Sequence, residues 1–187
     1  MRVIAGKFRS RPLRSLRGMG IRPTSERLRE TLFNVLTAGN PERLAGSVWV
    51  DLCAGTGAVG IEALSRGAAK VYFVESSKRA ANVIQENLRS LGITEEAELL
   101  RKDSVRAISD LEQRGARPDH IFLDPPYAMG ETYEQALSAL TNSVVGIAAV
   151  IIAEHDKRFD PGEKFGRLVR FRKLVQGDAG LSFYRAL

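Results

Sequence analysis

A chain of 187 residues with 44% hydrophobic and 27% charged side chains is long enough for one buried core and has an ordinary globular composition. Its apolar runs are shorter than the roughly 18 residues that a membrane span needs, and its N-terminus lacks the apolar core of a signal peptide. A single cysteine, Cys53, excludes an intrachain disulfide and leaves no cysteine cluster for a structural zinc. These features predict a cytoplasmic protein that has no membrane partner and no metal.

Positive charge is concentrated at the N-terminus. Residues 1–30 hold nine basic and two acidic side chains, whereas the rest of the chain holds 19 basic and 20 acidic ones. Such a cluster suits a phosphate-rich partner, because neutralising phosphates releases counterions. A solvated, partly disordered basic tail is the alternative.

The N-terminal segment is expected to form a small extension. Residues 1–23 mix basic residues, glycines and short apolar pairs, a pattern that favours a hairpin or arm over a helix. Thr24 or Ser25 can cap a helix that runs to about Ala38, and the Asn40-Pro41 pair ends it. This helix would turn one apolar face inward, formed by Leu28, Leu32, Val35 and Leu36.

From residue 47 onward, strands and helices are expected to alternate. The predicted strands are Val48–Leu52, Val71–Val74, Glu98–Leu100, His120–Leu123 and Ala148–Ala153, followed by an antiparallel pair, Leu168–Val175 and Leu181–Arg185. The predicted helices are Ala58–Ser65, Ser77–Leu91, Val105–Gln113 and Thr132–Leu140. This order predicts an α/β fold with a mostly parallel sheet, whose ligands bind beyond the carboxyl ends of the strands. The acidic residues expected at that rim are Asp51, Glu75, Asp103 and Asp124.

A glycine-rich segment, residues 51–60, follows the first strand. Gly55 and Gly60 have P-loop spacing, but Ile61 and Glu62 stand where that motif needs lysine and a hydroxyl, so the P-loop is excluded. The glycines also match the fingerprint for NAD or a flavin, with Glu75 at the distance of a ribose ligand. A third pattern, an acid before the glycines and another after the next strand, resembles class I S-adenosylmethionine methyltransferases. A tight turn without a ligand is the remaining alternative.

The segment Asp124-Pro125-Pro126-Tyr127 is the most specific motif in the chain. Two prolines hold the turn extended and donate no backbone hydrogen bonds, which leaves the Asp124 carboxylate as a fixed acceptor. Such an acceptor suits an exocyclic base amine, whose delocalised lone pair becomes nucleophilic when its N–H groups donate hydrogen bonds. Asp124 could also take the released proton, and Tyr127 could stack on the base. The alternative is that the two prolines only end the strand and that the acid before them has no function.

Several segments together resemble the RsmD family, which methylates N2 of a guanine in 16S ribosomal RNA. They are residues 2–7, residues 22–34, residues 51–66, Phe73-Val74-Glu75 and residues 124–127. The resemblance implies a Rossmann-like class I methyltransferase with a mostly parallel seven-stranded sheet, an antiparallel edge strand and a small basic N-terminal hairpin and helix extension. It also implies an arm and helix for RNA or subunit contact over residues 1–45 and a methyltransferase domain over residues 46–187.

The resemblance assigns roles to individual residues. Asp124, Pro125 and Tyr127 would be catalytic. The residues for S-adenosylmethionine would be Asp51, Cys53, Ala54, Gly55, Thr56, Gly57, Glu75, Ser76, Asp103, Ser104 and Asp124. Substrate would contact Arg2, Lys7, Arg9, Arg22, Thr24, Arg27, Pro126 and Tyr127. The partner would be 16S rRNA within the assembled or assembling small subunit, and a monomer is favoured.

Other functions share parts of these motifs. An adenine-N6 or protein glutamine methyltransferase also places an acid or asparagine before Pro-Pro-Tyr, although a glutamine enzyme would not need the basic arm. A non-catalytic RNA-binding module on the same fold is a further alternative, and the complete set of rim acids argues against it. The last third of the chain carries no assigned motif, and His120 and His155 are expected in structural roles.

Overall fold

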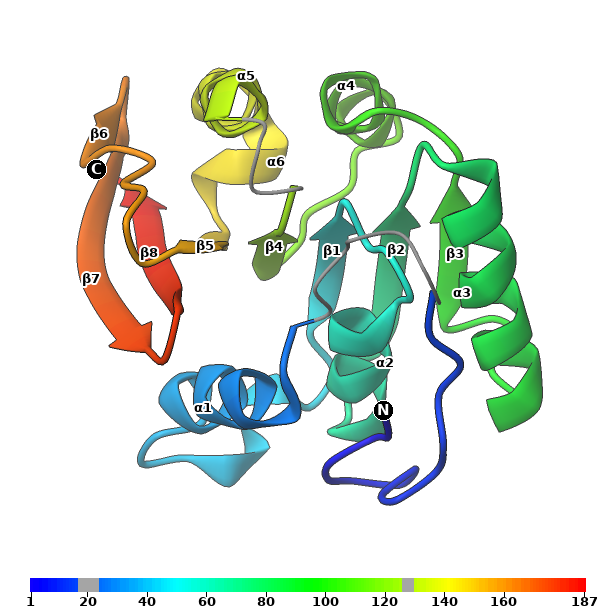
Figure 1. The fold of residues 1–187 in the computed structure, drawn as a ribbon. Coiled ribbons are helices and arrows are strands. Elements are labelled where there is room, and N and C mark those ends of the chain that lie inside the picture. Colours follow the sequence, from blue (N-terminus) through cyan, green and yellow to red (C-terminus); the bar gives the residue numbers. More distant parts are fainter. Residues whose placement is uncertain (17–23, 126–129) are drawn as a thin grey trace.

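The computed structural model describes residues 1–16, 24–125 and 130–187, and it is built on one eight-stranded sheet with helices on both faces (Figure 1). The strand order is β3-β2-β1-β4-β5-β8-β7-β6. The five parallel strands are β1 (Val48–Leu52), β2 (Lys70–Val74), β3 (Ala97–Leu100), β4 (His120–Leu123) and β5 (Val150–Asp156). The antiparallel strands are β6 (Lys164–Phe165), β7 (Leu168–Gln176) and β8 (Ala179–Ala186).

The predicted fold class is confirmed, and the strand count differs. The sequence predicted seven strands, whereas the sheet has eight. The added strand is β6, whose two residues pair with Val169 and Leu168 of β7. A two-residue strand has no readable alternation of apolar and polar side chains, so periodicity could not reveal it.

The helices lie close to their predicted positions. They are α1 (Glu26–Leu36), α2 (Ala58–Ser65), α3 (Lys78–Leu91), α4 (Ser104–Gln113), α5 (Gly130–Thr141) and α6 (Val144–Ile147), with a 3₁₀ turn, η1, at Pro41–Leu44. Ser25 caps α1, because its side chain accepts a hydrogen bond from the Leu28 amide, and Ser77 caps α3 in the same way through the Ala80 amide. The two helical elements that the sequence did not predict, η1 and α6, have four residues each.

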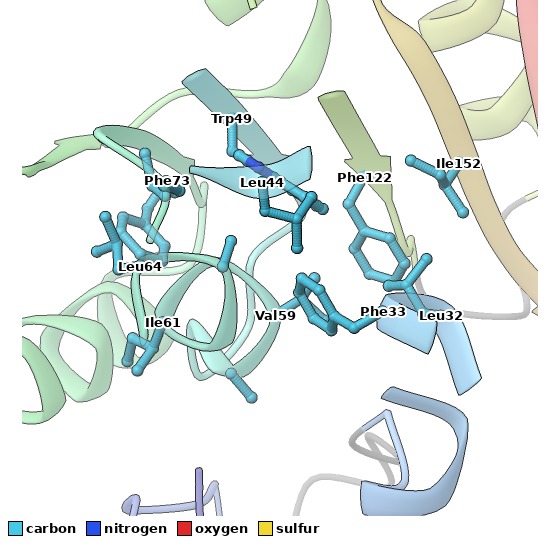
Figure 2. Packing of buried hydrophobic residues seen from close by; sticks show 14 of the residues in the cluster. Leu32, Phe33, Leu44, Trp49, Val59, Ile61, Leu64, Phe73, Phe122 and Ile152 are labelled. Atoms are coloured by element: carbon cyan, nitrogen blue, oxygen red, sulfur yellow. The ribbon is translucent and has the colours of Figure 1, made fainter. Parts of the chain in front are cut away.

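Two hydrophobic clusters cover the two faces of the sheet. On one face, α1 and α2 pack against Trp49 of β1 and Phe122 of β4, as Figure 2 shows. On the other face, α4, α5 and α6 pack against the alternate residues of the same strands, including Val50 and Ile121. The central strands are therefore apolar on both faces, as expected for a parallel sheet that helices cover on each side.

The N-terminal arm belongs to the first of these clusters. Arg2 and Pro12 form an antiparallel bridge that closes residues 2–12 into a hairpin-like loop. Val3 and Leu13 are buried among the residues of α1 and α2. The arm is therefore part of the folded core through Val3 and Leu13. The division of the chain into two parts after residue 45 stays a prediction. Among the helices of the described ranges, none is both long and apolar enough to cross a membrane.

Candidate active site at the carboxyl rim of the sheet

Acidic side chains from four neighbouring parallel strands meet at the carboxyl rim. Asp51 lies near the end of β1, Glu75 follows β2, Asp124 follows β4 and Glu154 lies in β5. Glu75 and Glu154 both act electrostatically on Asp51, while Asp51 and Glu154 act on Asp124. The predicted convergence of Asp51, Glu75 and Asp124 is therefore present, and Glu154 extends the set.

The glycine-rich segment curls around Asp51. Gly55 and Gly57 have φ angles of 57° and 78°, which glycine adopts without strain, and Gly57 is the N-cap of α2. The Gly60 amide donates to Asp51 Oδ2 at 2.9 Å. A Cβ added to Gly60 would lie 2.4 Å from the Phe73 ring, whereas one at Gly55 would meet only the Cys53 carbonyl oxygen, at 4.0 Å. Gly60 therefore allows helix and strand to pack closely, and Gly55 leaves open space at the rim.

Glu75 is held in place by two backbone amides. Its Oε2 accepts from the Gly55 amide at 2.9 Å, and its Oε1 accepts from the Ser77 amide at 2.7 Å. The carboxylate is only partly buried, and the neighbouring Ser76 is exposed. This arrangement orients an acceptor group at the end of β2, as a ligand for ribose hydroxyls requires.

Burial changes the protonation of the groups in and beside the loop. Asp51 is 2% exposed, and this burial raises the pKa of its carboxyl to about 8 against the opposing effect of the Gly60 hydrogen bond. Burial likewise raises the pKa of the Cys53 thiol to about 12, so Cys53 is a neutral thiol, 3.4 Å from the Ser104 hydroxyl. Cys53 also has φ 61°, a conformation rare outside glycine.

The remaining loop residues have mainly structural contacts. Asp103 is exposed and caps α4 by accepting from the Arg106 amide at 2.9 Å. Thr56 is buried, and its carbonyl accepts from Asn87 Nδ2 at 3.0 Å. Ala54 donates its amide to the Val74 carbonyl at 2.9 Å. A direct role of these residues in cofactor binding stays a prediction.

Asp124 faces a threonine from the N-terminal segment. Thr24 Oγ1 donates to Glu154 Oε2 at 2.7 Å and lies 3.4 Å from Asp124 Oδ2. Burial raises the pKa of Asp124 well above its usual value, and the negative neighbours Glu154 and Asp51 add to this effect. Pro125 is buried, while the predicted stacking residue Tyr127, together with Pro126, lies outside the described residues.

Glu154 is the site residue that the sequence analysis missed. It is 2% exposed and comes directly after the apolar residues 150–153 of β5. The strand was predicted to end at Ala153, whereas it continues to Asp156. The signal was available, because an acid at the end of an apolar strand is the same pattern that selected Asp51 and Asp124.

The predicted substrate residues divide between surface and interior. Arg2, Lys7, Arg9 and Arg27 are exposed, whereas Thr24 is buried against the rim acids. Three of these exposed residues, Arg2, Arg9 and Arg27, line one cavity of about 440 Å³ between the arm and α1. Arg22, also expected to contact substrate, lies outside the described residues.

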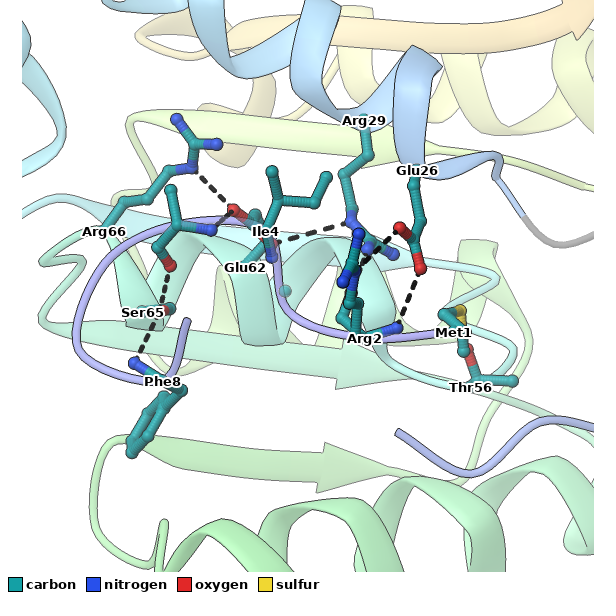
Figure 3. Close-up of polar contacts among 12 residues, drawn as sticks. Met1, Arg2, Ile4, Phe8, Glu26, Arg29, Thr56, Glu62, Ser65 and Arg66 are labelled. Atoms are coloured by element: carbon teal, nitrogen blue, oxygen red, sulfur yellow. Dashed lines mark hydrogen bonds and ion pairs between the residues drawn. The ribbon is translucent and has the colours of Figure 1, made fainter. Parts of the chain in front are cut away.

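A buried carboxylate fixes the arm to the helix that follows the loop (Figure 3). Glu62 of α2 accepts from the Ile4 and Ala5 amides at 2.8 and 3.0 Å, and from Arg66 Nε at 2.8 Å. Arg29 of α1 is also fully buried, and its Nε lies 3.6 Å from Glu62 Oε2. The sequence did not predict this role for Glu62, because an acidic residue on a short helix is expected to face solvent.

Comparison with known proteins places this architecture in a family. The model of the family described as "Conserved hypothetical protein 95", the RsmD family, matches residues 1–185. The chain belongs to the RsmD family. A ribosomal RNA small subunit methyltransferase D of Haemophilus influenzae is 40% identical over 84% of this chain and 79% of its own.

Two further relatives match over nearly their full lengths. A protein of Bacillus subtilis named as a candidate rRNA methyltransferase is 35% identical over 99% of this chain and 98% of its own. The solved structure of a candidate methyltransferase of Escherichia coli has a TM-score of 0.80 at 30% identity, and the match covers 100% of this chain and 97% of that one. The fold is thus that of the class I methyltransferases, as predicted.

The cofactor of this family is S-adenosylmethionine, and the rim fits it. Residues 51–60 contain no basic side chain, so the loop offers nothing to neutralise a phosphate, whereas this cofactor carries a cationic sulfonium and no phosphate. Glu75 would accept the ribose hydroxyls, and Asp51 would face the cationic part above the open side of Gly55. Among the described residues, no cluster of His, Cys, Asp or Glu could hold a metal ion.

Proposed function

We propose that this protein transfers a methyl group from S-adenosylmethionine to the exocyclic N2 amine of a guanine in small-subunit ribosomal RNA. One observation carries the proposal: the carboxyl of Asp124 stands at the end of β4, next to the cofactor loop, with its pKa raised by burial. The Haemophilus influenzae and Escherichia coli relatives named as small subunit methyltransferase D, 40% and 33% identical, support the choice of RNA.

The chemistry needs one well-placed acceptor. The bound cofactor supplies an electrophilic methyl group whose bonding electrons leave with sulfur. Asp124 accepts a hydrogen bond from the amine, which directs the nitrogen lone pair at the methyl carbon. As the new C–N bond forms, the amine releases one proton, and the Asp124 carboxylate takes it. A carboxyl with a raised pKa is suited to this step, because it binds a proton more readily near neutral pH.

The arm would provide the RNA contact. Arg9 and Arg27 stand with Arg2 around one cavity, on the same side of the sheet as α1. Phosphate groups of the rRNA, within the assembled or assembling small subunit in the cytoplasm, would contact these guanidinium groups. The roles of Tyr127 in stacking and of Arg22 in RNA binding remain part of the proposal.

Mapping the modified base tests the proposed function. Wild-type protein is incubated with methyl-labelled cofactor and small subunits that lack the modification, and the labelled nucleoside is identified. We expect label in a single guanine of 16S rRNA, as N2-methylguanine. Label in adenine or in a glutamine of a ribosomal protein would contradict guanine as the substrate. Absence of label, in a protein that still binds the cofactor, would favour a non-catalytic RNA-binding module.

A further inference from the structure

We propose that Glu154, acting through the Thr24 hydroxyl, is a positioning residue that orients the Asp124 carboxyl. The inference rests on the proposed function only in that Asp124 is taken as the group facing the substrate amine. It assigns a task to a buried glutamate of β5 and to a threonine of the N-terminal segment, which lie 130 residues apart in the chain.

The direction of the hydrogen bonds follows from the number of protons. A threonine hydroxyl has one hydrogen to donate and two lone pairs that accept. The contact to Glu154 is 2.7 Å, a normal length for a hydroxyl donor, whereas the contact to Asp124 is 3.4 Å. Thr24 therefore donates mainly to Glu154 and more weakly to Asp124, so that one hydroxyl bridges the two carboxyl groups.

The groups around Asp124 act on its charge state in opposite directions. Burial raises the pKa of Asp124, and the negative carboxyl groups of Glu154 in β5 and Asp51 in β1 raise it further, while the nearby Cys53 is a neutral thiol. The Thr24 hydroxyl lowers the pKa of Asp124, because its hydrogen bond favours the ionised carboxylate. The bridge thus holds Asp124 in one orientation and offsets part of the effect of its acidic neighbours.

Both ends of the bridge are fixed by the fold. The Glu154 carbonyl accepts from the Tyr133 hydroxyl of α5 at 2.6 Å, and Glu154 pairs with Leu181 of the antiparallel strand β8. Thr24 precedes Ser25, the cap of α1, and α1 is packed into the core through Leu28. A rigid strand and a capped helix therefore hold the hydroxyl between the two carboxyl groups.

Two substitutions separate this role from a purely structural one. Glu154→Gln keeps the shape and removes the charge, and Thr24→Val keeps the shape and removes the hydroxyl. Thr24→Ser, which retains the hydroxyl, and Glu134→Gln on the exposed side of α5 are the matched controls. Single-turnover methylation is measured from pH 5 to 9, and the Asp124 carboxyl is titrated by carbon-detected NMR in the same variants without RNA.

Each variant has a defined expected result. Glu154→Gln removes a negative neighbour, so the pKa of Asp124 and the acid limb of the rate profile both fall by about one pH unit. Thr24→Val removes the hydroxyl that lowers the pKa of Asp124, so this pKa and the acid limb of the rate profile both rise. The rate at the plateau drops by about tenfold, because the carboxyl is less well oriented. Thr24→Ser and Glu134→Gln keep the wild-type profile.

Other results overturn the inference. A fall in the Asp124 pKa in Thr24→Val would mean that the hydroxyl does not donate to the Asp124 carboxylate, which rules out the bridge. A uniform loss of rate at every pH, with the Asp124 titration unchanged, would mean that Glu154 and Thr24 serve folding alone. The NMR titration needs no methyl acceptor, so it reports on the bridge even if the proposed function fails, and failure of wild-type protein to methylate rRNA leaves its result intact.

Discussion

Two aspartates at the rim, Asp51 and Asp124, bind protons more readily than an ordinary aspartate. Asp51 is buried and Asp124 is partly buried beside other carboxyl groups, and this environment raises the pKa of both. An acid after an apolar strand is visible in the sequence, so Asp51, Glu75 and Asp124 could be predicted to meet. Their charge state could not, because it depends on burial and on neighbours such as Glu154 that come from distant segments. For the same reason the sequence could not show that Thr24, predicted to contact substrate, is buried against Glu154 and Asp124.

The raised pKa of Asp51 predicts how stability changes with pH. Its folded value of about 8 lies above the unfolded value of 3.8, so the folded protein binds more protons between these values, and stability falls as pH rises through that range. Between pH 6.5 and 8 we expect the free energy of unfolding of the cofactor-free protein to fall by about 1 to 2 kcal/mol. The buried His120, whose pKa burial lowers to about 4, opposes this trend only below pH 6.5.

Urea unfolding at the two pH values measures the effect. Asp51→Asn keeps an oxygen that can accept from the Gly60 amide and removes the titrating group, so its stability should change much less with pH. An equal slope in wild type and variant would mean that Asp51 does not titrate in this range.

Among the elements, α2 connects the cofactor loop to the arm. It follows directly on the loop glycine Gly57 and carries Glu62, which accepts from two arm amides and faces Arg29 of α1. The sequence predicted the bounds of α2 without error, because its apolar residues and its preceding glycines are local signals. The arm contact depended on the tertiary position of one buried acid, which no local pattern reports.

Glu62→Gln should destabilise the protein strongly. It leaves the fully buried Arg29 and the nearby Arg66 without their shared counter-charge, and breaking a buried ion pair typically costs about 3 to 5 kcal/mol. Glu86→Gln, which breaks the exposed pair with Arg14, is the matched control and should remain close to wild type. Thermal and urea unfolding check both variants, and similar midpoints for the two would refute the anchoring role of Glu62.

Across the whole molecule, the excess positive charge sits on an arm that is folded onto the sheet layer. The charge distribution could be predicted from the composition, and the α/β fold could be predicted from the alternation of strand and helix segments. The burial of Val3 and Leu13 could not be predicted, because a folded arm and a disordered tail can have the same composition. Deleting the arm would therefore disturb the core, and charge substitutions are the cleaner test of RNA binding.

Arg9→Gln combined with Arg27→Gln should flatten the salt dependence of RNA binding. Each phosphate contact contributes about 0.7 to 0.9 to the slope of log K against log salt, so the double variant should lose about 1 to 2 from that slope. Arg117→Gln, an exposed residue remote in sequence from the arm, is the control. Equilibrium binding to small-subunit rRNA at several salt concentrations measures the slopes. An unchanged slope in the double variant would mean that Arg9 and Arg27 do not contact RNA phosphates.

The central claim is that Asp124 acts on the methyl acceptor and not on the fold or the cofactor. Asp124→Ala is compared with wild type in single-turnover methylation of small subunits, with cofactor affinity measured by calorimetry on the same samples. We expect a rate loss of about 10²- to 10⁴-fold with cofactor affinity retained, because the substitution removes the proton acceptor and leaves the loop intact. Near-wild-type rates, or loss of cofactor binding in parallel with rate, would contradict it.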